Sequence, residues 1–170
     1  MNQKQTSKDR LPDRFPERVY TLNEVQKART LIEKGYKHRI RIKGNPSFKI
    51  KTQEAVKLIR SAGYYDFLRT YIRSIREIDG LSQLRESEAS IWANIYAVND
   101  PVDAACFFIQ KAWQMKRYVE GKIYYGPQGE TLAAEERVRF IKKLTSCTSD
   151  LKIKAKCLER LKLLEDSRFL

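Results

Sequence analysis

Apolar residues recur at every third or fourth position over most of the chain, which is the spacing of amphipathic helices. Start and stop signals divide this pattern into separate helices. Thr21 and Glu24 form a capping box, and Asn45 occupies an N-cap position ahead of Pro46. The pattern predicts helices over residues 21–34, 45–62, 64–78, 82–95, 101–120, 131–146 and 149–165.

The predicted helix 101–120 is expected to be the central and most buried one. It begins at a strong start signal, in which Asp100 can cap the helix and Pro101 fits its first position. Its apolar residues lie nearly all round the helix, a distribution typical of a helix that is buried on most sides. We therefore expect Ile109 and Trp113 to pack inside the core.

One segment, residues 36–43, alternates with a period of two and predicts a β-strand. One face of this strand would carry His38 with the isoleucines of the segment, and the other face would carry its cations. A single strand is not stable alone. The best candidate partner is the short run 122–125, which lies between two glycines.

Together these elements predict a mainly α fold, a compact multi-helix domain of about six or seven helices with one small two-stranded β element. The gaps between the predicted helices are short, so residues 17–170 are expected to form a single helical domain. Residues 1–16 show no periodicity and contain Pro12 and Pro16. They are expected to form a flexible N-terminal tail.

The composition favours a cytoplasmic protein that does not enter a membrane. The longest uninterrupted apolar run, Ala104 to Ile109, is far shorter than the ~20 residues that span a bilayer. The three cysteines, Cys106, Cys147 and Cys157, are an odd number without short spacing, which is a poor disulfide framework. The composition leaves the oligomeric state open.

No motif in the sequence indicates an enzyme, a metal site or a cofactor. His38 is the single histidine, and we interpret it as a structural residue. The cysteines lack zinc-site spacing. The glycine-punctuated run 121–129 lacks the Gly-Lys-Ser/Thr ending of a phosphate loop. The pairs of neighbouring acids are explained by helix capping and by the helix dipole. We expect no cofactor and no metal, and we favour a protein without catalytic activity over an enzyme.

The strongest functional indication is charge. The chain contains 34 Lys and Arg and 21 Asp and Glu, and its net charge is +13. Most of this excess lies between residues 37 and 60, where Glu54 is the single acid. A surface of one charge sign attracts polyanions. The predicted strand and the helix after it contribute the candidate nucleic-acid-binding residues Arg39, Arg41, Lys43, Lys49, Lys57 and Arg60. Whether the strand face and the helix face coincide depends on the fold.

A second unusual segment is 64–76, which combines tyrosines with arginines at helical spacing. Its candidate phosphate or base contacts are Tyr64, Tyr65, Arg69, Arg73 and Arg76. The alternative is a solvated face in which Asp66 pairs with Arg69 and Glu77 with Arg73, and charge runs on helices are usually of this kind.

Three functions follow from these observations. The first is a non-catalytic nucleic-acid-binding protein, of RNA or DNA, that uses the basic surface around residues 37–60. The alternative is a structural or scaffolding module that binds an acidic protein partner, with the C-terminal residues 167–170 as a docking tail. The third is an enzyme with an unrecognised site in 64–76. Salt-dependent binding to single- and double-stranded nucleic acid separates the first function from the other two.

Overall fold

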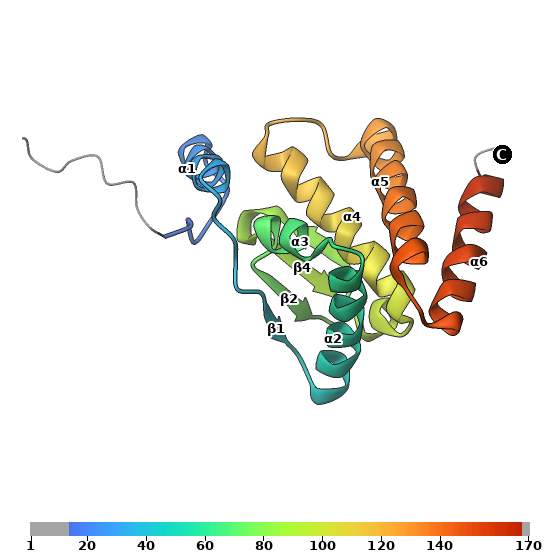
Figure 1. Ribbon diagram of the computed structural model, residues 1–170. Coiled ribbons are helices and arrows are strands. Elements are labelled where there is room, and N and C mark those ends of the chain that lie inside the picture. The colour runs from blue at the N-terminus through green and yellow to red at the C-terminus, as the bar shows by residue number, and fades with distance from the viewer. Residues whose placement is uncertain (1–13, 168–170) are drawn as a thin grey trace, which may run out of the picture.

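The computed structural model describes residues 14–167, which form six α-helices, two 3-10 helices and a four-stranded sheet (Figure 1). The sheet order is β1-β2-β4-β3. The elements, in chain order, are α1 (Leu22–Glu33), β1 (Arg41–Lys43), α2 (Pro46–Ser61), α3 (Tyr65–Tyr71), β2 (Ser74–Glu77), β3 (Gln83–Arg85), η1 (Glu86–Glu88), β4 (Ser90–Ala93), η2 (Ile95–Val98), α4 (Pro101–Val119), α5 (Gly126–Cys147) and α6 (Leu151–Ser167).

The three helix starts with the strongest sequence signals are confirmed. At α1, the Thr21 hydroxyl accepts from the Glu24 N–H at 3.2 Å, and the Glu24 carboxylate accepts from the Thr21 N–H at 2.9 Å. At α2, the Asn45 side chain accepts from the backbone N–H three residues later, at 2.9 Å. At α4, Asp100 accepts from the Asp103 N–H at 2.9 Å. These bonds satisfy N–H groups that have no partner within the helix.

The fold is mainly α as predicted, but the prediction of a two-stranded β element was wrong. Strand β1 pairs in parallel with β2, β2 pairs in parallel with β4, and β3 pairs antiparallel with β4. The expected partner of β1, residues 122–125, forms no strand. The predicted helix 64–78 is instead the short α3 followed by β2, and the predicted helix 82–95 is replaced by β3, η1, β4 and η2.

The missed strands carry isoleucines at spacings that also suit a helix. The backbone leaves the helical conformation at Ile72, where φ is −114° and ψ is 120°. Ile75 in β2 and Ile91 in β4 then become fully buried in the centre of the sheet. A short buried strand has one or two apolar residues pointing inward, so periodicity alone does not separate it from a helix.

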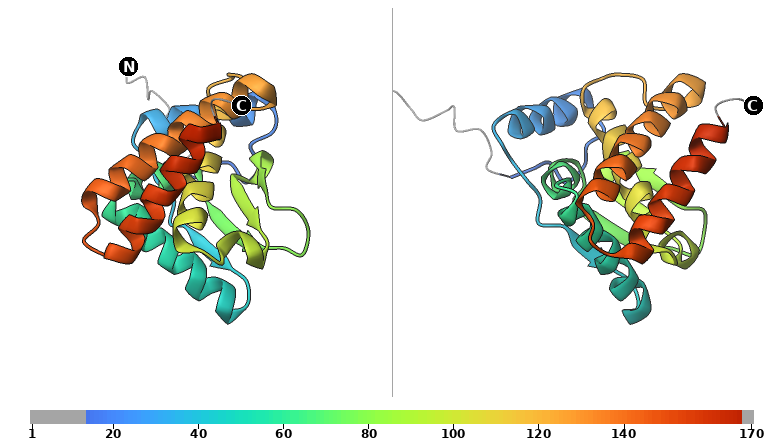
Figure 2. Two further views of the ribbon diagram at one scale, coloured as in Figure 1. Left: turned by 90° about the vertical axis from the view of Figure 1, so that its right-hand side faces the viewer. Right: turned by 45° about the vertical axis from the view of Figure 1, so that its right-hand side comes forward.

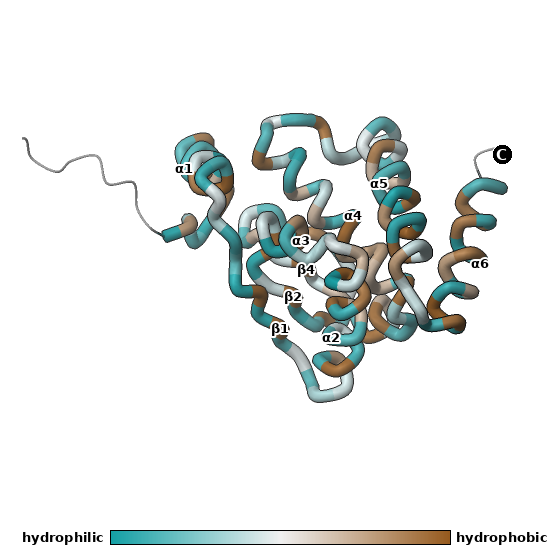
Figure 3. The backbone as a smooth tube through the Cα atoms, in the orientation of Figure 1, coloured by the Kyte–Doolittle hydropathy of each residue, from teal (hydrophilic) through white to brown (hydrophobic). Residues whose placement is uncertain are grey.

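The helices gather on one side of the sheet (Figure 2). Helix α4 contacts α2, α3 and α5, while α6 packs on α5 at the outside of the molecule. Hydrophobic and hydrophilic positions alternate along the outer helices α5 and α6 (Figure 3). Within α4, Ile109 is fully buried. Trp113 is half-buried, with the Arg117 guanidinium 5.4 Å from its ring centroid, so it lies at the border of the core.

The segment before α1 is packed against the domain. Phe15 is 9% exposed, and its ring centroid lies 5.4 Å from that of Tyr36. Val19 is fully buried, and its N–H donates to the Ser87 carbonyl at 2.8 Å. Residues 14–16 of the predicted tail therefore belong to the folded part, and residues 1–13 of that prediction lie outside the described residues. In residues 14–167 no helix has the length and apolar character to cross a membrane.

Candidate functional site

The sheet has an apolar face toward the helices and a polar face opposite. Side chains alternate along each strand, so residues paired across strands share a face. The buried row toward the helices is Ile42, Ile75, Ile91 and Leu84. The opposite side, which we name the polar sheet face, carries two rows. They are Arg41, Ser74, Ser90 and Arg85, and beside them Lys43, Arg76, Trp92 and Gln83. No helix of residues 14–167 lies over this face (Figure 2).

Two adjoining hollows lie at the polar sheet face where the parallel strands begin. The larger has a volume of about 410 Å³. It is lined by one carboxylate, Glu17, and by the cations Arg14, Arg39, Arg41, Lys43 and Arg73. The smaller, of about 220 Å³, shares Lys43 and Arg73 with the first and adds Arg76 and Glu88. With Arg85 from β3, the linings of the two hollows and the two rows of the polar sheet face together contain seven cations and two carboxylates.

The structure divides the predicted basic residues between the two sides of β1. Arg39, Arg41 and Lys43 line the larger hollow on the polar sheet face. Lys57 and Arg60 line a different hollow of about 250 Å³, between β1 and α2. The apolar side of β1 points to α2, so the helix cations meet isoleucines there and not the strand cations. The strand face and the helix face therefore do not form one patch.

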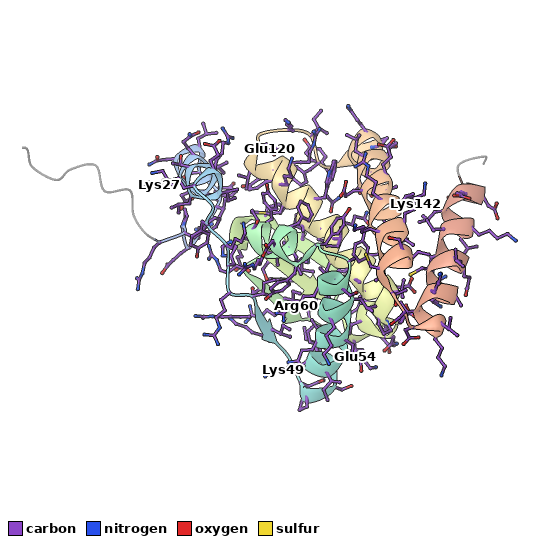
Figure 4. The ribbon with its side chains drawn as sticks, viewed as in Figure 1. Lys27, Lys49, Glu54, Arg60, Glu120 and Lys142 are labelled. Carbon is purple, nitrogen blue, oxygen red and sulfur yellow. The ribbon has the colours of Figure 1, made fainter. Side chains whose placement is uncertain are left out.

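Helix α2 nevertheless has a basic side of its own. Figure 4 shows Lys49 and Arg60 on the same side of α2 and Glu54 on another. The Arg60 guanidinium lies 4.1 Å from the ring centroid of Tyr65. Lys49 is exposed. Arg60 therefore stacks on an aromatic ring and Lys49 is exposed to solvent. Both lie apart from the larger concentration of cations on the polar sheet face.

Arg73 does not lie on one helix face with Arg69 and Arg76, contrary to the sequence interpretation. It precedes β2, and its guanidinium donates to the backbone carbonyls of Glu17, at 2.9 Å, and of Pro16. It also lies 5.1 Å from the Phe15 ring centroid. Arg73 thereby holds the N-terminal segment across the start of the sheet. Burial lowers the pKa of the Arg73 guanidinium. The expected ion pair of Arg73 with Glu77 does not form.

The remaining residues of 64–76 have mostly structural contacts. Arg69 pairs with Asp66 at 2.7 Å, as the alternative interpretation expected. The Tyr64 ring packs edge-on against Phe140 at 5.2 Å, and burial raises its pKa. Tyr65 lies beneath two guanidinium groups, including that of Arg69 at 5.5 Å. Of the candidates in this segment, only Arg73 and Arg76 reach the polar sheet face.

Sequence reasoning missed five residues of this face, which are Ser74, Gln83, Arg85, Ser90 and Trp92. Trp92 falls within the predicted helix 82–95, but in β4 it is partly exposed on the polar side. The Arg85 guanidinium lies 4.4 Å from its ring centroid. The alternation of residues 90–93, which are Ser, Ile, Trp and Ala, carried a signal for a strand, but the run is too short to decide.

His38 forms part of the wall of the larger hollow and is 3% exposed. Its ring packs edge-on against Phe15 at 4.4 Å and against Tyr36 at 5.1 Å. Burial, assisted by the positive charge of Arg73, lowers its pKa to about 4. The imidazole is therefore neutral at pH 7 and adds no charge to the hollow. Packing of this kind supports a structural role.

Comparison with known proteins gave no match to a family, to a curated protein or to a solved structure. Among the described residues, no group of three His, Cys, Asp or Glu side chains is placed to hold a metal ion.

Proposed function

We propose that the protein is a non-catalytic nucleic-acid-binding protein that contacts the phosphate backbone through the polar sheet face. One observation carries this proposal. The cations that gather there outnumber the carboxylates, and none of them forms an ion pair within 4.0 Å in residues 14–167. These cations are Arg14, Arg39, Arg41, Lys43, Arg73, Arg76 and Arg85.

Unpaired cations on a concave surface suit a polyanion. Each phosphate that such a surface neutralises releases condensed counterions, which gives an affinity that does not depend on base sequence. Six of the seven cations are arginines, whose planar fork can donate two hydrogen bonds to one phosphate. Because no helix covers the described face, a strand of nucleic acid has access to all of them except Arg73, which already holds the N-terminal segment.

An acidic protein partner remains the second candidate, because carboxylates are also attracted to a basic surface. The partly exposed indole of Trp92 favours nucleic acid, since an aromatic ring beside cations can stack on a base. The hypothesis of an enzyme site in 64–76 loses its basis, because the three arginines on which it relied do not share a helix face.

The test is a pair of matched double variants. Arg41→Gln with Arg76→Gln removes one cation from each row of the polar sheet face. Lys154→Gln with Lys162→Gln removes the same charge from exposed positions on α6, on the opposite side of the molecule. Both pairs should leave stability nearly unchanged, because exposed charges contribute only ~0–1 kcal/mol.

The binding of fluorescent oligonucleotides, measured by anisotropy at fixed salt, decides between the candidates. We expect the face variant to bind at least tenfold more weakly, since each lost phosphate contact weakens binding for every sequence. The α6 variant should bind like the parent. Equal affinity of the two variants would refute the proposal. Polyglutamate that binds the parent more tightly than an oligonucleotide of the same charge would favour the acidic partner.

A further inference from the structure

We propose that Trp92 is a base-stacking position and that the polar sheet face selects single-stranded over double-stranded nucleic acid. This inference rests on the proposed function and specifies its ligand. Trp92 is the single aromatic residue in the two rows of the face, and it lies between Arg76 and Gln83 in its row. Cations lie on one side of it and an amide on the other.

The register of the strands places the components of such a site side by side. Arg76 of β2 and Gln83 of β3 are the direct cross-strand neighbours of Trp92, and Lys43 of β1 lies beyond Arg76. Neighbouring strands lie ~4.8 Å apart, so Lys43 is ~10 Å from Trp92. Phosphates held by Arg76 and Lys43 would therefore leave an attached base within reach of the indole.

The Arg85 guanidinium stacks on the Trp92 ring, and a base can displace it. The Arg85 guanidinium lies 4.4 Å from the Trp92 ring centroid, and its Nε has no hydrogen-bond partner in the described residues. Arg85 forms no ion pair there either. A cation–π contact near the surface is weaker than the stacking of a base on an aromatic ring. A base therefore replaces the guanidinium, which then becomes available to a phosphate.

Single strands are selected because only they expose the faces of their bases. In a duplex each base is stacked between its neighbours, so a duplex can use the cations of the face but not Trp92. The exposed amide of Gln83, directly opposite Trp92, can donate to and accept from the edge of a stacked base. Contacts to the phosphate backbone alone would bind single strands and duplexes alike, and stacking on Trp92 adds affinity for single strands.

Tryptophan fluorescence tests this directly, because the chain has two tryptophans and one can be removed. Trp113 lies at the border of the core, and in the variant Trp113→Phe all tryptophan emission comes from Trp92. Oligothymidylate or oligouridylate should quench this emission on binding. A duplex of the same length and an abasic oligonucleotide of the same charge should bind at least fivefold more weakly and leave the emission nearly unchanged. Thermal unfolding of Trp113→Phe checks that the domain is intact.

A second set of variants makes the result independent of fluorescence. Trp92→Ala should lose about tenfold in affinity for single strands and little for duplex, while Trp92→Phe should retain most of the single-strand affinity. Tyr96→Ala, at an exposed aromatic of η2 on the helix side of the sheet, should change neither.

The outcomes separate the two proposals. If single-stranded, duplex and abasic oligonucleotides all fail to bind, the proposed function itself is refuted. If the abasic strand binds as tightly as oligothymidylate and the Trp92 emission does not change, the stacking inference is overturned while backbone binding stands.

Discussion

Burial of His38 makes a quantitative prediction about stability and pH. Its ordinary pKa is 6.5, and packing against Phe15 and Tyr36 beside Arg73 lowers it to about 4 in the folded protein. Between these values the unfolded chain binds the proton and the folded chain does not, so acid favours unfolding. The contribution of His38 is complete above pH 6.5 and is lost as the pH falls toward 4. One pKa unit corresponds to ~1.4 kcal/mol, so the loss is about 2 kcal/mol at pH 5 and about 3 kcal/mol below pH 4.

The assay is urea unfolding of the parent and of His38→Gln at pH 7, 6 and 5. Glutamine is polar and does not titrate, so it changes the free energy of unfolding at all three values by the same amount. The parent should lose about 2 kcal/mol more than the variant between pH 7 and pH 5. The difference isolates His38 from the carboxylates, which both proteins share. Equal pH dependence of the two proteins would show that the folded protein accommodates a charged His38.

Three further predictions concern the core and the cysteines. Ile109→Ala should lower the free energy of unfolding by ~2–5 kcal/mol in urea titrations, because the side chain is fully buried in α4. Phe15→Ala should cost about 3 kcal/mol and lower the thermal midpoint, whereas an unchanged midpoint would mean that the segment before α1 does not stabilise the domain. At pH 8 the exposed Cys147 should react rapidly with a thiol reagent, while the buried Cys106, whose pKa is raised to about 12, should react only on unfolding.

The helices could be predicted where capping residues and apolar periodicity agree. Thr21, Asn45 and Asp100 accept hydrogen bonds from backbone N–H groups in the first turn of their helices, so the information that starts these helices is local. The identity of α4 as the central helix was also predictable, because its apolar residues exceed what one interface can cover. The prediction was less accurate for Trp113, because an apolar residue on a central helix can still lie at the border of the core.

The sheet could not be predicted, because its pairing depends on residues distant in the sequence. Ile42 of β1 lies beside Ile75 of β2 only after α2 and α3 have crossed between them. The same long-range pairing creates the polar sheet face. Lys43 was identified from its alternation, but Arg76, which pairs with it, and Trp92, which pairs with Arg76, belong to segments that were interpreted as helices. A site that is assembled across strands is visible in sequence only as separate parts.

The central claim, that the cations of the polar sheet face contact phosphates, is tested most directly by the salt dependence of binding. For single strands, the logarithm of the association constant falls with the logarithm of the salt concentration by ~0.7 for each phosphate contact. The six cations that are free to contact phosphates would give a slope of about −4, and Arg41→Gln with Arg76→Gln should make it less steep by about 1.4. The account predicts this change for oligonucleotides together with an unchanged slope for Lys154→Gln with Lys162→Gln. A slope that is the same in the parent and in the face variant would contradict it.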